Sequence, residues 1–165
     1  GLSFAEHGVY LLNEGQKLQY PSLWDLASRA GRSVWVCGSM NAKYDDGING
    51  WVLPDPWTES GAYPKELNRF YNFVRSQVQE HSNEHKGLSA SDAADFLAFL
   101  ATHGLSTSTI AALSAQLLNE RFSDSRWKRA VLLDRMQWDL FKWRFRRATP
   151  DFSTFFLNST AHFQH

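Results

Sequence analysis

The chain has 165 residues, of which 43% are hydrophobic and 21% charged, as is typical of a folded globular protein. Seventeen Lys and Arg residues balance seventeen Asp and Glu residues, so the total charge does not indicate a strongly basic nucleic-acid-binding protein. A single cysteine excludes an intrachain disulfide, and the chain has no run of about eighteen apolar residues that would predict a membrane span. The chain begins at Gly1 and ends at His165 with no initiator Met and no polar tail, so we interpret it as an internal piece of a longer protein. The sequence assigns no cellular compartment to this protein.

Residues 1–62 are predicted to be the first part of an α/β core. Apolar residues recur at helical spacing over 21–31, where Gly31 is a suitable end, and predict a short helix. The apolar run 33–38 predicts a buried strand, in which Cys37 is interpreted as a core thiol rather than a nucleophile. Gly, Asp, Asn and Pro are frequent over 44–63 and predict a long loop. The acidic residues of this loop fit no calcium-binding spacing and are interpreted as ordinary loop acids; they are Asp45, Asp46, Asp55 and Glu59.

Residues 63–148 are predicted to be a helical insertion, which we call the cap. Apolar residues with a 3.6-residue period predict four helices, over 64–81, over 89–103, from Ser106 or Thr107 to 118, and from Asp124 or Ser125 to 147. Residues 149–165 are predicted to return to the core through a buried strand at 152–157. This order of elements predicts an α/β fold with a mostly parallel sheet.

The last predicted helix is basic and aromatic. Residues 121–147 carry nine Lys and Arg residues against three Asp residues, a net +6 that leaves −6 on the rest of the chain. Together with Trp127, Trp138 and Trp143, these cations can attract an anionic partner or substrate. The other interpretation is a solvated helix face whose Trp side chains pack inward and join the cap to the core.

Two polar segments contain candidate functional residues. Asn158, His162 and His165 follow the strand predicted at 152–157, and ligands of parallel sheets bind beyond the carboxyl ends of strands. Imidazoles at this spacing can share a metal ion, usually zinc, or can be polar loop residues. Near the other end of the chain, the amide of Asn13 can donate a hydrogen bond to an oxyanion, or can belong to a turn.

Three stretches of the chain, taken together with their order and spacing, can be compared with the sequence motifs of known families. They are residues 1–9 (GLSFAEHGV), residues 21–36, which begin with PSLWDLA, and residues 155–162 (FFLNSTAH). Together they resemble segments of the alkaline phosphatase superfamily, most closely its branch of type I phosphodiesterases and nucleotide pyrophosphatases. The resemblance covers under half of the chain and does not include the cap. It implies that residues 1–62 and 149–165 are part of the parallel-sheet core of an alkaline phosphatase-like fold.

The resemblance also implies a metal-dependent phosphoester hydrolase acting on a small phosphate or sulfate ester. In that superfamily two divalent cations, here zinc or manganese, activate a Ser or Thr nucleophile. His162 matches a metal-ligand His, and Asn158 stands where the family usually has a ligand Asp, so a neutral amide oxygen replaces a carboxylate. Asn13 lies near the position of the family's phosphate-binding Asn, one residue off its spacing from His7. No catalytic nucleophile and few of the metal ligands match within this chain, so we expect the piece itself to be inactive and leave open whether it acts as an enzyme.

A second hypothesis is a non-enzymatic binding or interaction module. In this case the basic aromatic segment 121–147 binds an anionic partner, and Asn158 marks a lost metal site. For the chain as a whole we expect no membrane partner and do not favour a nucleic acid, but in this second hypothesis salt-dependent binding to a nucleic acid or another polyanion would be the supporting observation. The strands at 33–38 and 152–158 are expected to lack their neighbours, so an oligomer formed through exposed strand edges is a further expectation.

Overall fold

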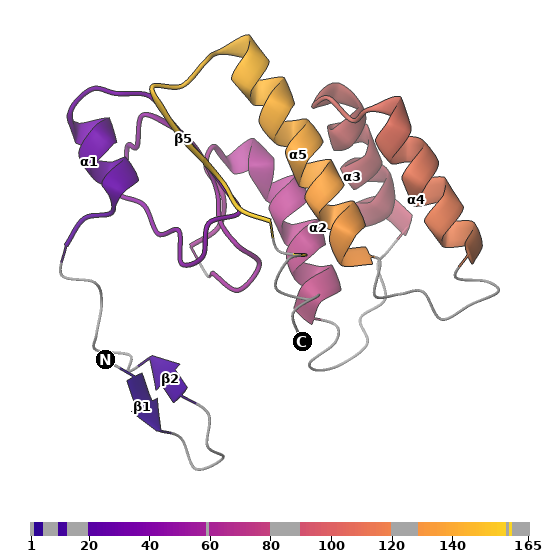
Figure 1. The fold of residues 1–165 in the computed structure, drawn as a ribbon, viewed down its shortest axis with the longest axis horizontal. Helices are drawn as coiled ribbons and strands as arrows, with labels where there is room; N and C mark the ends of the chain where they lie inside the picture. The colour runs from indigo at the N-terminus through magenta and orange to yellow at the C-terminus, as the bar shows by residue number, and fades with distance from the viewer. Residues whose placement is uncertain are drawn as a thin grey trace.

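The computed structural model describes most of the chain, namely residues 2–4, 10–12, 20–58, 60–79, 90–119, 129–157 and 159. These residues form a mixed α/β structure with five α-helices, one three-stranded parallel sheet and one antiparallel strand pair (Figure 1). The antiparallel pair consists of β1 (Leu2–Phe4) and β2 (Tyr10–Leu12), which were not predicted. None of the helices in the described part of the chain is long and apolar enough to cross a membrane.

The parallel sheet has the strand order β4-β3-β5. The central strand is β3 (Val34–Cys37), and it pairs in parallel with β4 (Gly50–Leu53) and with β5 (Phe152–Phe155). The predicted strands at 33–38 and 152–157 and their parallel arrangement are therefore confirmed. The prediction that 44–63 is only a loop is wrong, because β4 lies within it. As a consequence, the strand at 33–38 does not lack its neighbours: it is paired on both sides.

The two faces of the sheet are covered by different helices. Val34, Val36 and Val52 face α1 (Leu23–Arg29), and their cluster includes the partly buried side chain of Trp24. The helix predicted at 21–31 is thus confirmed, with Ser22 as its N-cap. The Ser22 side chain accepts a hydrogen bond from the Asp25 backbone N–H, and the Asp25 carboxylate accepts one from the Ser22 N–H at 3.1 Å.

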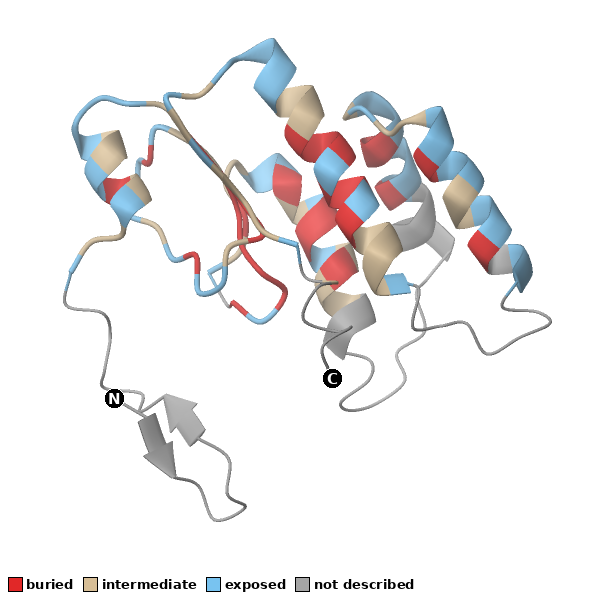
Figure 2. Cartoon of the chain, viewed as in Figure 1, coloured by how far each residue is buried: buried red, intermediate tan, exposed pale blue. Residues whose placement is uncertain are grey.

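The opposite face of the sheet packs against the cap. The predicted cap helices are present as the 3₁₀ turn η1 (Lys65–Leu67) followed by α2 (Asn68–Gln79), then α3 (Ala90–Thr102), α4 (Thr107–Asn119) and α5 (Arg129–Arg147). Trp35, Cys37 and Leu53 share one hydrophobic core with buried residues of α2, α3 and α5. Buried positions accordingly line the sheet and the helix faces that turn toward it (Figure 2). Cap and sheet therefore form a single packed core.

Aromatic side chains make up much of the contact between α5 and the sheet. Trp35 stacks on Phe141 with ring centroids 5.8 Å apart, and its indole N–H donates to the Phe141 carbonyl oxygen at 3.3 Å. Trp51 of β4 packs against Trp143 of α5 at 5.9 Å. The interpretation that Trp side chains join cap to core is confirmed for these residues. Trp57 differs from these residues, since it is 62% exposed.

Candidate functional site

The carboxyl ends of the three parallel strands meet at one edge of the sheet. Cys37, the last residue of β3, lies opposite Leu53 of β4 and Phe155 of β5. The segments that follow these strands therefore leave the sheet side by side. In parallel α/β sheets this edge is where ligands bind, because loops and helix termini converge there. We call this region the carboxyl edge.

A glycine turn follows β3 at the carboxyl edge. The Gly38 N–H donates to the Leu53 carbonyl oxygen at 2.7 Å, and Gly38 has a φ of +75°, which a residue with a side chain rarely adopts. A Cβ atom at this position would lie 2.2 Å from the Gln137 amide nitrogen. Beyond the turn, the Ser39 and Thr154 hydroxyl oxygens lie 2.9 Å apart and share a hydrogen bond. The turn thus fixes β3 to both neighbouring strands.

A buried carboxylate organises the loop that follows β4. Asp55 is 4% exposed and accepts hydrogen bonds from the backbone N–H groups of Asn41 and Trp57, at 2.8 and 2.9 Å, and from the Thr58 hydroxyl. Asn41 follows β3 and the other two donors follow β4, so Asp55 holds together the two parts of the chain that follow these strands. Asp45 pairs with Arg29 on the surface. Both residues act as loop acids, as predicted, and Glu59 lies outside the described residues.

Helix α5 holds the segment that follows β5. The side-chain amide of Gln137 donates to the Phe156 carbonyl oxygen at 3.2 Å, and the carboxylate of Asp134 accepts from the Ser159 backbone N–H at 2.8 Å. Gln137 and Asp134 are 6% and 5% exposed and lie one helical turn apart. The cap therefore fixes the backbone on both sides of position 158, although Asn158 itself is not described. Asp134 and Gln137 lie among the apolar positions of α5, and this pattern in the sequence could have identified them as candidate functional residues.

Cys37 lies beside this pair but is not suited to be a nucleophile. Its side chain is fully buried, and burial raises the pKa of the Cys37 thiol well above its usual value. A hydrogen bond with Gln137 lowers the pKa, and the nearby Asp134 raises it further. The thiol is therefore neutral near pH 7, which agrees with the prediction of a core cysteine.

The residues that the sequence singled out for metal and substrate binding cannot be placed. Asn13, Asn158 and His162 all lie outside the described residues, and so does His165. In the part of the chain that the structure describes, no three His, Cys, Asp or Glu side chains are grouped so that they could hold a metal ion. What the structure does place is the strand exit that leads into the Asn158–His162 segment.

The opposite edge of the sheet, where the strands begin, is basic and aromatic. Near the end of α5, the guanidinium of Arg144 lies 4.7 Å from the ring centroid of Trp51, and that of Arg147 lies 4.5 Å from the ring centroid of Trp143. Lys142 instead pairs with the buried carboxylate of Asp139 at 3.0 Å. Trp143 thus packs against Trp51 of the sheet while Arg144 and Arg147 lie over these two rings, whereas Trp138 is 43% exposed.

Comparisons with protein-family models, with curated proteins and with solved structures gave no match to this chain.

Proposed function

We propose that this chain is part of a metal-dependent phosphoester hydrolase of the alkaline phosphatase type, related to type I phosphodiesterases and nucleotide pyrophosphatases. The observation that carries the proposal is the parallel pairing of β3 with β5, with Cys37 opposite Phe155. Because of this pairing, the Asn158–His162 segment starts at the carboxyl edge, where α/β enzymes bind their ligands. In this proposal, residues 1–62 and 149–165 belong to an alkaline phosphatase-like core and 63–148 to its cap.

The proposed donors fit a divalent cation only as part of a larger set. The imidazole of His162 and the amide oxygen of Asn158 supply two ligands, whereas a zinc site usually has at least three from the protein. The other ligands and the nucleophile therefore come from residues elsewhere in the complete protein. When bound, two such cations, zinc or manganese, lower the pKa of the nucleophile and stabilise charge on the attacking and leaving oxygens. Asn13 contributes a hydrogen bond to the phosphate or sulfate group.

The part that the described residues play is to position the ligand segment. Asp134 and Gln137 hold the backbone at Ser159 and Phe156, on either side of Asn158. Metal ligands bind tightly when neighbouring groups fix their orientation, and loss of such groups typically weakens metal binding about 10–100-fold. The cap therefore serves the site by holding this backbone as well as by covering it.

The test is an assay of the complete parent protein, loaded with zinc or manganese, on aryl phosphodiesters, phosphomonoesters and sulfate esters. We expect hydrolysis of at least one class, and loss of both bound metal and activity in His162→Ala. The matched control is His165→Ala, which removes an imidazole with no counterpart in the family pattern. A folded, metal-loaded parent that is inert on all three ester classes contradicts the proposal.

The second candidate is a module that binds an anionic partner through 121–147. Arg144 and Arg147 favour it, because neither forms an ion pair with a carboxylate of the described residues. Trp143 packs against Trp51 and carries Arg147, so charge rather than ring stacking would provide the affinity. A steep loss of polyanion binding between low and high salt supports this function, and binding that is absent or independent of salt removes it.

A further inference from the structure

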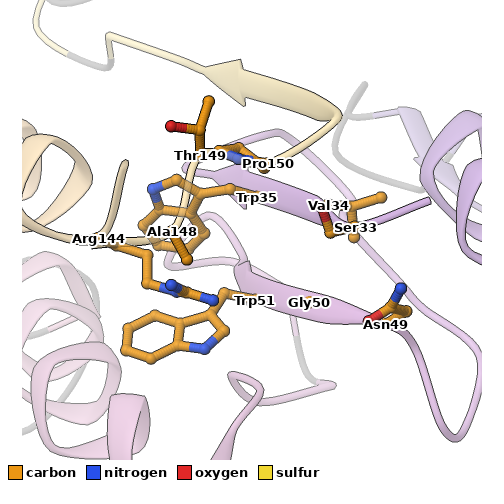
Figure 3. A pocket seen from close by; sticks show the side chains of 10 residues that line it. All are labelled: Ser33, Val34, Trp35, Asn49, Gly50, Trp51, Arg144, Ala148, Thr149 and Pro150. Atoms are coloured by element: carbon orange, nitrogen blue, oxygen red, sulfur yellow. The ribbon is translucent and has the colours of Figure 1, made fainter. Parts of the chain in front are cut away.

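A cleft opens where the strands of the parallel sheet begin, at the edge opposite the candidate hydrolase site. It has a volume of about 210 Å³ and lies between the first residues of β3 and β4 and the connection from α5 to β5. Trp35, Trp51, Asn49, Arg144 and Thr149 are among the residues that line it (Figure 3). Pockets for drug-sized ligands usually have about 300–1,000 Å³, so this cleft suits a small ligand or one group of a larger ligand.

Arg144 is the one charged side chain among the residues that line the cleft, so the lining carries a net positive charge. The nearest acidic residue in sequence, Asp151, accepts hydrogen bonds from the N–H and hydroxyl of Ser33, a residue that lines the cleft, each at 2.8 Å, and its charge is balanced by Arg32 at 3.5 Å. Arg144 has no carboxylate partner among the described residues. Among the described residues, therefore, no carboxylate competes with a ligand for the charge of Arg144.

The position of the Arg144 guanidinium also suits hydrogen bonding to an anion. It lies over the indole ring of Trp51, with 4.7 Å between guanidinium carbon and ring centroid, as Figure 3 shows. When a guanidinium lies over an aromatic ring, its N–H groups point outward from the edge of the guanidinium, and two of them can bind two oxygens of one carboxylate or phosphate. The indole N–H of Trp51 likewise has no acceptor among the described residues.

The end of α5 beside the cleft does not cancel this positive charge. A helix C-terminus carries a partial charge of roughly −0.5, which repels anions. The last turn of α5 contains Arg144, Arg146 and Arg147, so three full positive charges lie close to that partial negative charge. The net field at the cleft attracts an anion.

We propose that this cleft binds a small oxyanion, a carboxylate or a phosphate group, through paired hydrogen bonds from Arg144, whose guanidinium lies over the Trp51 ring. The site is separate from the carboxyl edge, since the four residues of β3 place the two edges about 10 Å apart. The proposal does not rest on the hydrolase function. Its ligand contacts the α5–β5 connection at Ala148 to Pro150, so an occupied cleft stabilises the segment that leads into β5.

The experiment titrates the protein with inorganic phosphate and, separately, with succinate, using calorimetry and tryptophan fluorescence. We expect saturable binding of at least one of them, in the range of about 10 mM or tighter. The arm that saturates tells phosphate from carboxylate chemistry. Chloride at matched ionic strength controls for non-specific screening.

Three variants separate the paired hydrogen bonds from simple charge attraction. Arg144→Gln removes the charge, and Arg144→Lys keeps the charge but loses the paired N–H groups, so both should weaken binding about tenfold or more. Arg146→Gln removes the same charge from the same helical turn but does not line the cleft, and it should bind nearly as the unmodified protein does. Circular dichroism verifies that each variant is folded. Absence of saturable binding in the unmodified protein, or equal weakening by Arg146→Gln, overturns the proposal.

Discussion

Replacing Gly50 with alanine should destabilise the chain more than any other glycine substitution in the sheet region. Gly50 starts β4 with a φ of +151°, and an added Cβ atom would lie 2.0 Å from the Val34 carbonyl oxygen and 2.8 Å from the Val34 nitrogen. Val34 cannot move away, because it belongs to the central strand and is paired with Phe152 on its other side. The obstacle is therefore backbone rather than a flexible side chain.

The expected loss has two parts. The backbone conformation of Gly50 costs a residue with a Cβ atom about 1–3 kcal/mol. Displacing β4 also weakens the hydrogen bond from the Val34 N–H to the Asn49 carbonyl oxygen, now 2.9 Å, and a neighbouring ladder bond, at about 1 kcal/mol each. The sum is about 4 kcal/mol. For a chain of this size it corresponds to a fall in Tm of about 8 °C or more.

Urea unfolding followed by tryptophan fluorescence measures this loss, because Trp35 and Trp51 lie in the affected strands. Gly47→Ala is the matched control: Gly47 has a φ of +79°, but an added Cβ atom would meet nothing within 4 Å, so only about 1 kcal/mol of backbone strain applies. A Gly50→Ala variant as stable as Gly47→Ala would contradict the close approach of β4 to β3.

Three other substitutions probe the cap. Burial raises the pKa of Asp139, but hydrogen bonds from Thr109, Ser106 and Lys142 lower it overall. The Asp139 carboxylate therefore contributes its full stabilisation at pH values above the usual carboxyl pKa of about 3.9, and this stabilisation is lost as the pH falls through the lower pKa of the folded state. Asp139→Asn should cost about 2 kcal/mol of stability at pH 7, and the free energy of unfolding of this variant should fall less steeply at acid pH. Phe141→Ala should cost about 3–4 kcal/mol in urea unfolding, since Phe141 is 9% exposed and stacks on Trp35; a loss under about 1 kcal/mol would contradict that packing. Asp134→Ala should weaken metal binding by the parent protein about 10–100-fold in calorimetry, whereas unchanged metal affinity would show that Asp134 does not position the ligand segment.

The sequence was sufficient to predict the elements with strong periodicity. Helices α2 to α5 have apolar residues at a 3.6-residue period, the longer apolar runs 33–38 and 152–157 contain β3 and β5, and the order of these elements predicts a parallel sheet with a helical cap. Strand β4 was missed because only Trp51, Val52 and Leu53 carry its signal, between Asn49-Gly50 and Pro54. A run this short gives no period, and its partner lies 16 residues earlier in the chain, so its pairing depends on tertiary context.

For the two edges of the sheet, too, only part of the candidate sites could be predicted from the sequence. Types of residue are visible in a sequence, so Asn158, His162 and the net charge of 121–147 could be singled out. Which groups share an edge depends on register: Trp51 meets Arg144 because β4 pairs beside β3 and α5 crosses the sheet there. Without β4 there is no cleft to predict. The missed strand thus hid a candidate binding site as well as part of the fold, and the neutral total charge gave no hint of a positive cleft at one edge.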